Sequence, residues 1–86
     1  MTSDAIKARI QTLAPNTQVE LVDLTGTNDH WQALIVSPAF EGRSLIQQHR
    51  MVFDLFKSEV ESNDVHALSL KTFTPEQWAQ KNHQKN

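Results

Sequence analysis

The first half of the chain changes from a helical to a strand pattern of apolar positions. Over residues 3–13 the apolar positions recur at intervals of four and three, which predicts a short helix with the core-facing residues Ile6, Ile10 and Leu13. Residues 17–24 are apolar without that period, and residues 31–36 form a second apolar run after a turn-rich segment. The two runs predict an antiparallel β-hairpin.

The longest predicted helix begins at Ser44. Ser44 and Gln47 match the capping box, in which each side chain binds one unpaired backbone N–H of the first turn. The positions that follow lie on a single face about four turns long: Leu45, His49, Val52, Phe56 and Val60.

A strand and a last helix complete the pattern. Residues 65–73 alternate between apolar and polar side chains, as in a strand with one solvated face. Thr74 and Gln77 form a second capping box with proline between them, and this predicts a helix that carries Trp78.

The expected element order is therefore αββαβα. We expect one α+β domain over residues 1–80 and a polar tail over residues 81–86. The second and third strands are joined through a helix, so they can lie parallel. This arrangement predicts a mixed three-stranded sheet with helices on one face.

Composition narrows the possible chemistry. The 86 residues can hold one domain, and their formal net charge of −2 gives little attraction to phosphate backbones. Because cysteine is absent, the chain has neither disulfides nor thiolate ligands. It shows no signal peptide and no run of about 20 apolar residues, so we expect a soluble cytoplasmic protein without membrane contact. Without a partner it is expected to be a monomer or weak homodimer.

Three separated segments resemble the BolA family. They read IVSPAFEG at residues 35–42, QHR at residues 48–50 and HALSLKTFTPEQW at residues 66–78. The resemblance covers nearly the whole chain, and it implies a class II KH-like fold with the same αββαβα order. It also implies a partner of monothiol glutaredoxins that shares a bridging [2Fe–2S] cluster and acts in iron–sulfur assembly, trafficking or iron sensing.

The resemblance assigns the cluster ligand to His66. A second family ligand, Cys or His, usually lies in the loop that here comprises Thr25, Gly26, Thr27, Asn28 and Asp29. Thr27 stands in the place of the usual Cys and is a poor ligand for iron. His30, which precedes an aromatic residue as in many relatives, is the other candidate.

Cluster chemistry requires sulfur from outside this chain. Iron in such clusters takes thiolate or imidazole, and this chain offers imidazole alone, so the thiolates must come from glutathione and a partner's cysteine. A ligating imidazole nitrogen must be unprotonated, so we expect cluster binding to weaken below the ordinary histidine pKa of about 6.5.

Structural explanations compete with these assignments. His66 shares strand parity with Leu68, and His30 begins a strand, so both also fit half-buried histidines at strand ends. Arg43, Arg50 and Lys57 are spaced by seven and predict a basic stripe along the long helix. That stripe fits a solvated face, a glutaredoxin contact or a DNA-binding surface.

DNA or RNA binding is the alternative function. A KH-like fold and transcriptional roles in the family allow it, but KH modules use a Gly-x-x-Gly loop, and Gly26 and Gly42 lie far apart. Nucleophile–base pairs and phosphate loops are missing from the sequence, so no catalytic residue is assigned and we expect no enzyme.

Overall fold

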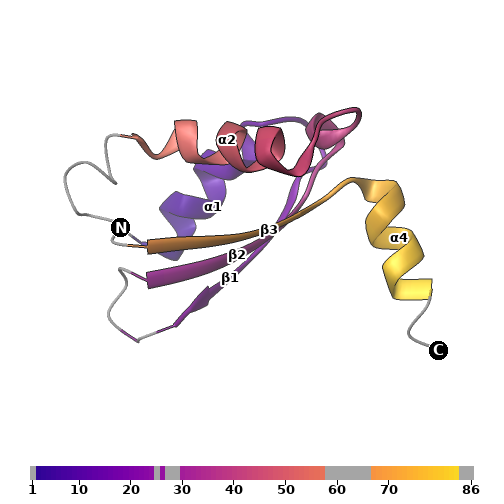
Figure 1. Cartoon of the computed structure of the whole chain (residues 1–86). Helices are drawn as coiled ribbons and strands as arrows, with labels where there is room; N and C mark the ends of the chain where they lie inside the picture. Colours follow the sequence, from indigo (N-terminus) through magenta and orange to yellow (C-terminus); the bar gives the residue numbers. More distant parts are fainter. Residues whose placement is uncertain (1, 25, 27–29, 58–66, 84–86) are drawn as a thin grey trace.

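In the described part of the chain, three α-helices and a short 3₁₀ helix accompany a mixed three-stranded sheet (Figure 1). The computed structural model describes residues 2–24, 26, 30–57 and 67–83. The elements are, in chain order, α1 (Ser3–Gln11), β1 (Gln18–Asp23), β2 (His30–Val36), the 3₁₀ helix η1 (Pro38–Phe40), α2 (Leu45–Leu55), β3 (Ala67–Phe73) and α4 (Pro75–His83). The predicted αββαβα order is confirmed, with η1 as an unpredicted addition.

Strand β2 is the centre of the sheet. It pairs antiparallel with β1, where Val19 aligns with Ile35, and parallel with β3, where Ala33 aligns with Leu70. Both the predicted hairpin and the predicted parallel crossover are therefore present. The parallel pairing also brings the first residues of β2 and β3 to the same end of the sheet.

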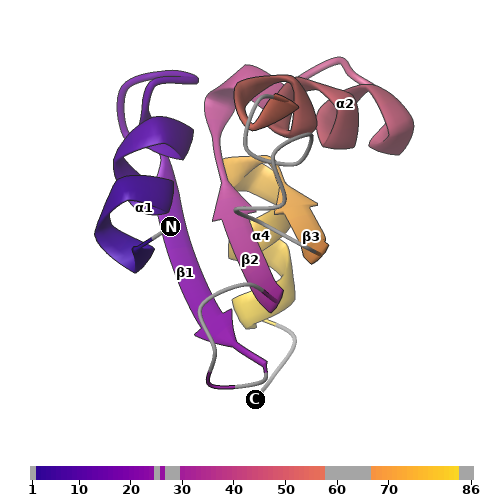
Figure 2. The same ribbon diagram turned by 90° about the vertical axis from the view of Figure 1, so that its left-hand side faces the viewer.

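Helices α1 and α2 cover one face of the sheet, with α1 over β1 and α2 toward β3 (Figures 1 and 2). Alternate strand residues point toward them, because successive side chains of a strand face opposite sides. The buried core consists of Ile6, Ile10, Val19, Trp31, Ala33, Ile35, Phe40, Val52 and Phe56. In the described part of the chain, no helix is long and apolar enough to span a membrane.

Helix α4 leaves the end of β3 and runs away from the other two helices (Figure 1). Its Trp78 ring lies 5.4 Å from the Phe73 ring, and the Lys81 amine lies 4.8 Å from the same ring. Phe73 alternates with the buried Thr72 along β3, so α4 is anchored from the side of the sheet opposite α1 and α2. The prediction that the helices lie on one face of the sheet therefore holds for α1 and α2 but not for α4. Helix α4 ends at His83, so it includes the first three residues of the expected polar tail.

The starts of α2 and α4 match their predicted capping boxes. Ser44 and Gln47 exchange side-chain-to-backbone hydrogen bonds of 3.0 and 3.2 Å, and Thr74 and Gln77 do the same at 3.0 and 3.1 Å. These bonds satisfy backbone groups that the helix itself leaves unpaired.

The end of α2 differs from the prediction. The helix stops at Leu55, and the final position of the predicted face, Val60, lies outside the described residues. A guanidinium N–H of Arg9 donates to the Leu55 carbonyl oxygen at 3.3 Å and the same guanidinium lies 5.4 Å from the Phe56 ring. A contact from α1 therefore occupies the C-terminal end of α2.

Candidate functional site

The candidate ligand edge is the end of the sheet where β2 and β3 begin. His30, the first residue of β2, aligns with Ala67, the first residue of β3. His66 is the residue before Ala67 in the sequence and lies outside the described residues. The parallel register therefore places the start of β2 beside the start of β3, which carries part of the family motif.

His30 is half-buried, and its backbone forms a hydrogen bond within the β1–β2 hairpin. Its carbonyl oxygen accepts a hydrogen bond of 2.8 Å from the Leu24 N–H. The next residue, Trp31, is buried under the helices, so the His30 side chain belongs to the opposite, open face of the sheet. A ligand role for His30 would therefore be exercised from the open face.

The hairpin loop is described at one position. Gly26 has a φ of 74°, in the left-handed region that glycine adopts without steric cost, and its N–H donates to the Asp23 carboxylate at 2.9 Å. The other predicted loop contacts lie outside the described residues: Thr25, Thr27, Asn28 and Asp29. The described part of the loop thus leaves β1 through a turn held by Asp23.

The described residues at the ligand edge offer too few ligands to hold a metal ion by themselves. Within residues 2–24, 26, 30–57 and 67–83, no three His, Asp or Glu side chains gather to hold a metal ion. An imidazole at the strand start fits the iron of a [2Fe–2S] cluster only as part of a larger set, because such clusters need four protein or small-molecule ligands. Among the described residues, His30 is therefore the one candidate ligand that this end of the sheet offers.

The predicted basic stripe does not run along one helix. Arg50 lies within α2, whereas Arg43 precedes the N-cap Ser44 and Lys57 follows the C-cap Phe56. The three cations are all exposed, so they are available to a partner. The spacing of seven implied one continuous helical face, and the early end of α2 removes Lys57 from it.

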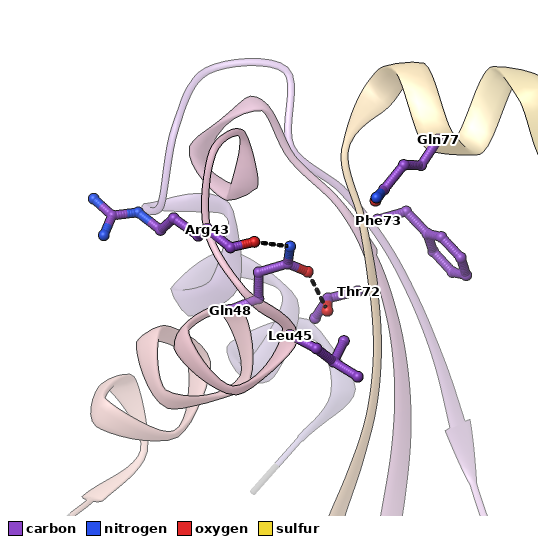
Figure 3. Close-up of a pocket in the computed structure, with 6 residues that line it drawn as sticks. All are labelled: Arg43, Leu45, Gln48, Thr72, Phe73 and Gln77. Carbon is purple, nitrogen blue, oxygen red and sulfur yellow. Dashed lines mark hydrogen bonds between the residues drawn. The ribbon is translucent and has the colours of Figure 1, made fainter.

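A buried polar link joins α2 to β3, and the sequence pattern did not predict it. The Gln48 side chain, 5% exposed, donates to the Arg43 carbonyl oxygen at 2.9 Å and accepts from the Thr72 hydroxyl at 2.7 Å (Figure 3). A pocket of about 410 Å³ lies beside it, lined by Arg43, Leu45, Gln48, Thr72, Phe73 and Gln77. A glutamine on the inner side of an amphipathic helix was the available signal, because a buried amide requires partners.

A second hollow, of about 370 Å³, lies on the outer side of α2. Its lining residues are Ile46, His49, Arg50 and Phe53, which follow the helical spacing of three and four. The periodicity placed His49 on one apolar face with Val52, but in the structure it is half-buried and lines this outer hollow. We call this surface the α2 hollow.

Comparison with known proteins gives one consistent family. A family model described as BolA-like protein matches residues 4–77. A BolA-like protein of Dictyostelium discoideum is 40% identical over 60 residues, which cover 70% of this chain and 53% of that protein. BolA-like protein 2 of Mus musculus is 38% identical over 72 residues, which cover 84% of this chain and 81% of the mouse protein. The matched part thus spans about half of the first relative and most of the second.

A third relative and a solved structure extend the comparison. The DNA-binding transcriptional regulator BolA of Haemophilus influenzae is 35% identical over 57 residues, covering 66% of this chain and 54% of that protein. The crystal structure of a Bol-like protein from Babesia bovis is similar with a TM-score of 0.82 and 26% identity, covering 95% of this chain and 94% of the other. The likeness therefore holds for both the sequence and the arrangement of helices and strands.

Proposed function

Because the chain belongs to the family of BolA-like proteins, we propose that it is a non-catalytic adaptor that binds a monothiol glutaredoxin and helps to ligate a bridging [2Fe–2S] cluster. His66 is the first ligand in this proposal and His30 the second. The observation that carries it is the parallel register, in which His30 aligns with Ala67, the residue that follows His66. Strand β2, which begins at His30, and strand β3, which begins one residue after His66 in the sequence, thereby start at the same end of the sheet.

The remaining ligands come from the partner and from glutathione. The chain has no cysteine, so it can supply imidazole nitrogen and no thiolate. Replacing thiolate by imidazole on an iron raises the reduction potential of a [2Fe–2S] centre. An adaptor that supplies imidazole would therefore raise the reduction potential of the cluster and would also determine which protein shares it. Both effects suit a role in cytoplasmic cluster assembly, trafficking or iron sensing.

The test is a spectroscopic titration. The protein is mixed with a monothiol glutaredoxin, iron, sulfide and glutathione, and the visible circular dichroism is compared with that of the glutaredoxin homodimer. We expect a distinct heterodimer spectrum that His66→Ala abolishes, because that substitution removes a ligand. His83→Ala, at the end of α4, is the matched control. An unchanged spectrum for His66→Ala would contradict the ligand assignment.

DNA binding is the second candidate, favoured by the name of the Haemophilus influenzae relative, a DNA-binding transcriptional regulator. The exposed cations Arg43, Arg50 and Lys57 would contact phosphates. Affinity for duplex DNA should then fall steeply as salt rises, and each cation replaced by alanine should reduce the salt slope by about 1. Binding that is undetectable or insensitive to salt would exclude this function.

A further inference from the structure

Strand β3 forms a lateral edge of the sheet, because no further strand pairs with it in the described part of the chain. The Ser37 N–H donates to the Phe73 carbonyl oxygen at 3.0 Å, so Phe73 directs its backbone groups toward β2. This direction alternates along a strand, and Leu68, Leu70 and Thr72 therefore direct their N–H and carbonyl groups away from β2. We call this row of backbone groups the β3 edge. Such a row is a template for another extended strand.

Helix α2 overhangs the β3 edge. Figure 2 shows its N-terminal part extending past β3 on the side where the sheet ends. Leu45, its first residue, lines a pocket together with Thr72 of the β3 edge. Leu55 packs against the core on the side of α1, and Ile46 and Phe53 project from the opposite side of the helix, because successive residues are about 100° apart. The α2 hollow therefore faces the space beside the β3 edge.

The overhanging side of α2 is apolar. Leu45 is 60% exposed, Ile46 is 71% exposed and Phe53 is 41% exposed. Burial of such side chains against a partner yields about 25 cal/mol per Å² of apolar surface removed from water. A partner that covers both features must bring a strand for the β3 edge and an apolar helix surface for α2.

A second copy of this chain brings both features in the required arrangement. A two-fold axis perpendicular to the sheet at Leu70 places β3 antiparallel to β3 of the second copy and joins the two sheets edge to edge. The same axis keeps both α2 helices on one face of the joined sheet and sets them side by side. Each overhanging α2 then covers part of the other copy's sheet, and the exposed apolar side chains of the two helices meet.

The charges of β3 favour this register. With the axis at Leu70, all three residues of the β3 edge find partners, and Lys71 lies opposite Ser69 of the second copy. An axis at Lys71 would place two lysines directly opposite each other, which destabilises strand pairing. An axis at Ser69 would leave Thr72 without a partner in the second strand.

We propose that the β3 edge and the α2 hollow together form a self-association surface, through which two copies of this chain build one continuous six-stranded sheet. An extended peptide from another protein fits less well, because it would pair with the β3 edge and leave Ile46 and Phe53 exposed. The dimer requires neither iron nor another protein, so it stands independently of the proposed function.

The first test measures the dimer and its helix contact. Sedimentation velocity of the full chain over a range of concentrations should show a reversible monomer–dimer equilibrium. Ile46→Asp and Phe53→Asp should each raise the Kd about tenfold or more, because each places a charge in the apolar contact. Val22→Asp is the matched control: Val22 is 53% exposed on β1, at the other side of the sheet, and its Kd should stay within about twofold of wild type.

The second test examines the register by exchanging charges. Ser69→Lys should raise the Kd about threefold or more, because it places a lysine opposite Lys71 of the second copy. The double variant Ser69→Lys with Lys71→Glu should restore dimerisation, since opposite charges then face each other. Weakening by the single variant without rescue by the double variant would overturn the register.

Hydrogen exchange followed by NMR tests strand pairing directly. The Leu70 N–H should exchange slowly at concentrations where the dimer prevails and rapidly in the monomer. The Leu21 N–H is the control, because the bond from the Leu24 N–H to the His30 carbonyl oxygen directs Leu21 away from β2, toward the β1 side of the sheet. Its exchange should be equally rapid at both concentrations. A monomer at every concentration would overturn the proposal, as would a dimer in which the Leu70 N–H exchanges as rapidly as in the monomer.

Discussion

The two ends of the sheet differ in how their polar groups are used. At the end where β2 and β3 stop, the buried Ser37 donates its N–H to the Phe73 carbonyl oxygen at 3.0 Å and shares a hydroxyl hydrogen bond of 2.9 Å with Thr17. Gln48 and Thr72 add a buried side-chain link at the same end. This scaffold end is held by hydrogen bonds that join distant parts of the chain.

The end where β2 and β3 begin carries the candidate ligand instead. Two of the hydrogen bonds at this end join residues close in sequence: the Leu24 N–H donates to the His30 carbonyl oxygen, and the Gly26 N–H donates to the Asp23 carboxylate. The buried hydrogen bonds between distant segments predict that the scaffold end contributes more to stability than the ligand edge does. Substitutions at the two ends should therefore separate folding from binding.

The largest expected effect is at the scaffold end, in η1. Phe40→Ala should reduce the free energy of unfolding by about 3–5 kcal/mol, because Phe40 is fully buried and its removal leaves a cavity. Urea denaturation followed by far-ultraviolet circular dichroism measures this loss. Phe53→Ala, on the exposed side of α2, is the matched control and should cost less than about 1 kcal/mol. Equal losses of unfolding free energy in Phe40→Ala and Phe53→Ala would contradict the stabilising role of the scaffold end.

The Gln48–Thr72 link should give an intermediate effect. Gln48→Ala leaves the Thr72 hydroxyl and the Arg43 carbonyl oxygen without this partner, so we expect a loss of about 1–3 kcal/mol in unfolding free energy. A double-mutant cycle with Thr72→Val should show a coupling of about 0.5 kcal/mol or more. Strictly additive losses would mean that the hydrogen bond does not stabilise the scaffold end.

The smallest effect on folding should come from the ligand edge. His30→Ala should lower the free energy of unfolding by less than about 1 kcal/mol, because the side chain is half-buried at a strand start. The same substitution should alter the visible circular dichroism of the cluster complex with glutaredoxin. A loss of several kcal/mol, with an unaltered cluster spectrum, would make His30 a structural residue and remove it from the ligand set.

The features that were predictable from the sequence are local. Both capping boxes, at Ser44 and Thr74, depend on residues three positions apart, and both are present with the predicted bonds. The hairpin and the parallel strand follow from apolar runs and the helix between them. The strand and helix predicted for the family motif at residues 66–78 are present as β3 and α4, and His66 itself lies outside the described residues.

The features that escaped prediction depend on distant contacts. Helix α2 ends at Leu55, where Arg9 of α1 binds its carbonyl oxygen, and no pattern within α2 reveals that contact. The 3₁₀ helix η1 follows Ser37, whose hydroxyl accepts the Ala39 N–H at 3.2 Å, and the sequence at this point suggested the end of a strand alone. The α2 hollow also escaped prediction, because the predicted apolar face included His49, which lines the hollow, and Leu45, which is 60% exposed.

The parallel pairing of β2 with β3 also has a consequence for the order of folding. The β1–β2 hairpin closes a short loop, and isolated hairpins form within about 1–10 μs. Strand β3 can join only after the chain has passed through η1 and α2, which is a longer closure with a greater entropic cost. We therefore expect the alignment of His30 with Ala67 to be among the last steps of folding. A nascent chain that stops before β3 lacks one half of that edge, so the proposed cluster sharing would require that β3 has been synthesised and has joined the sheet.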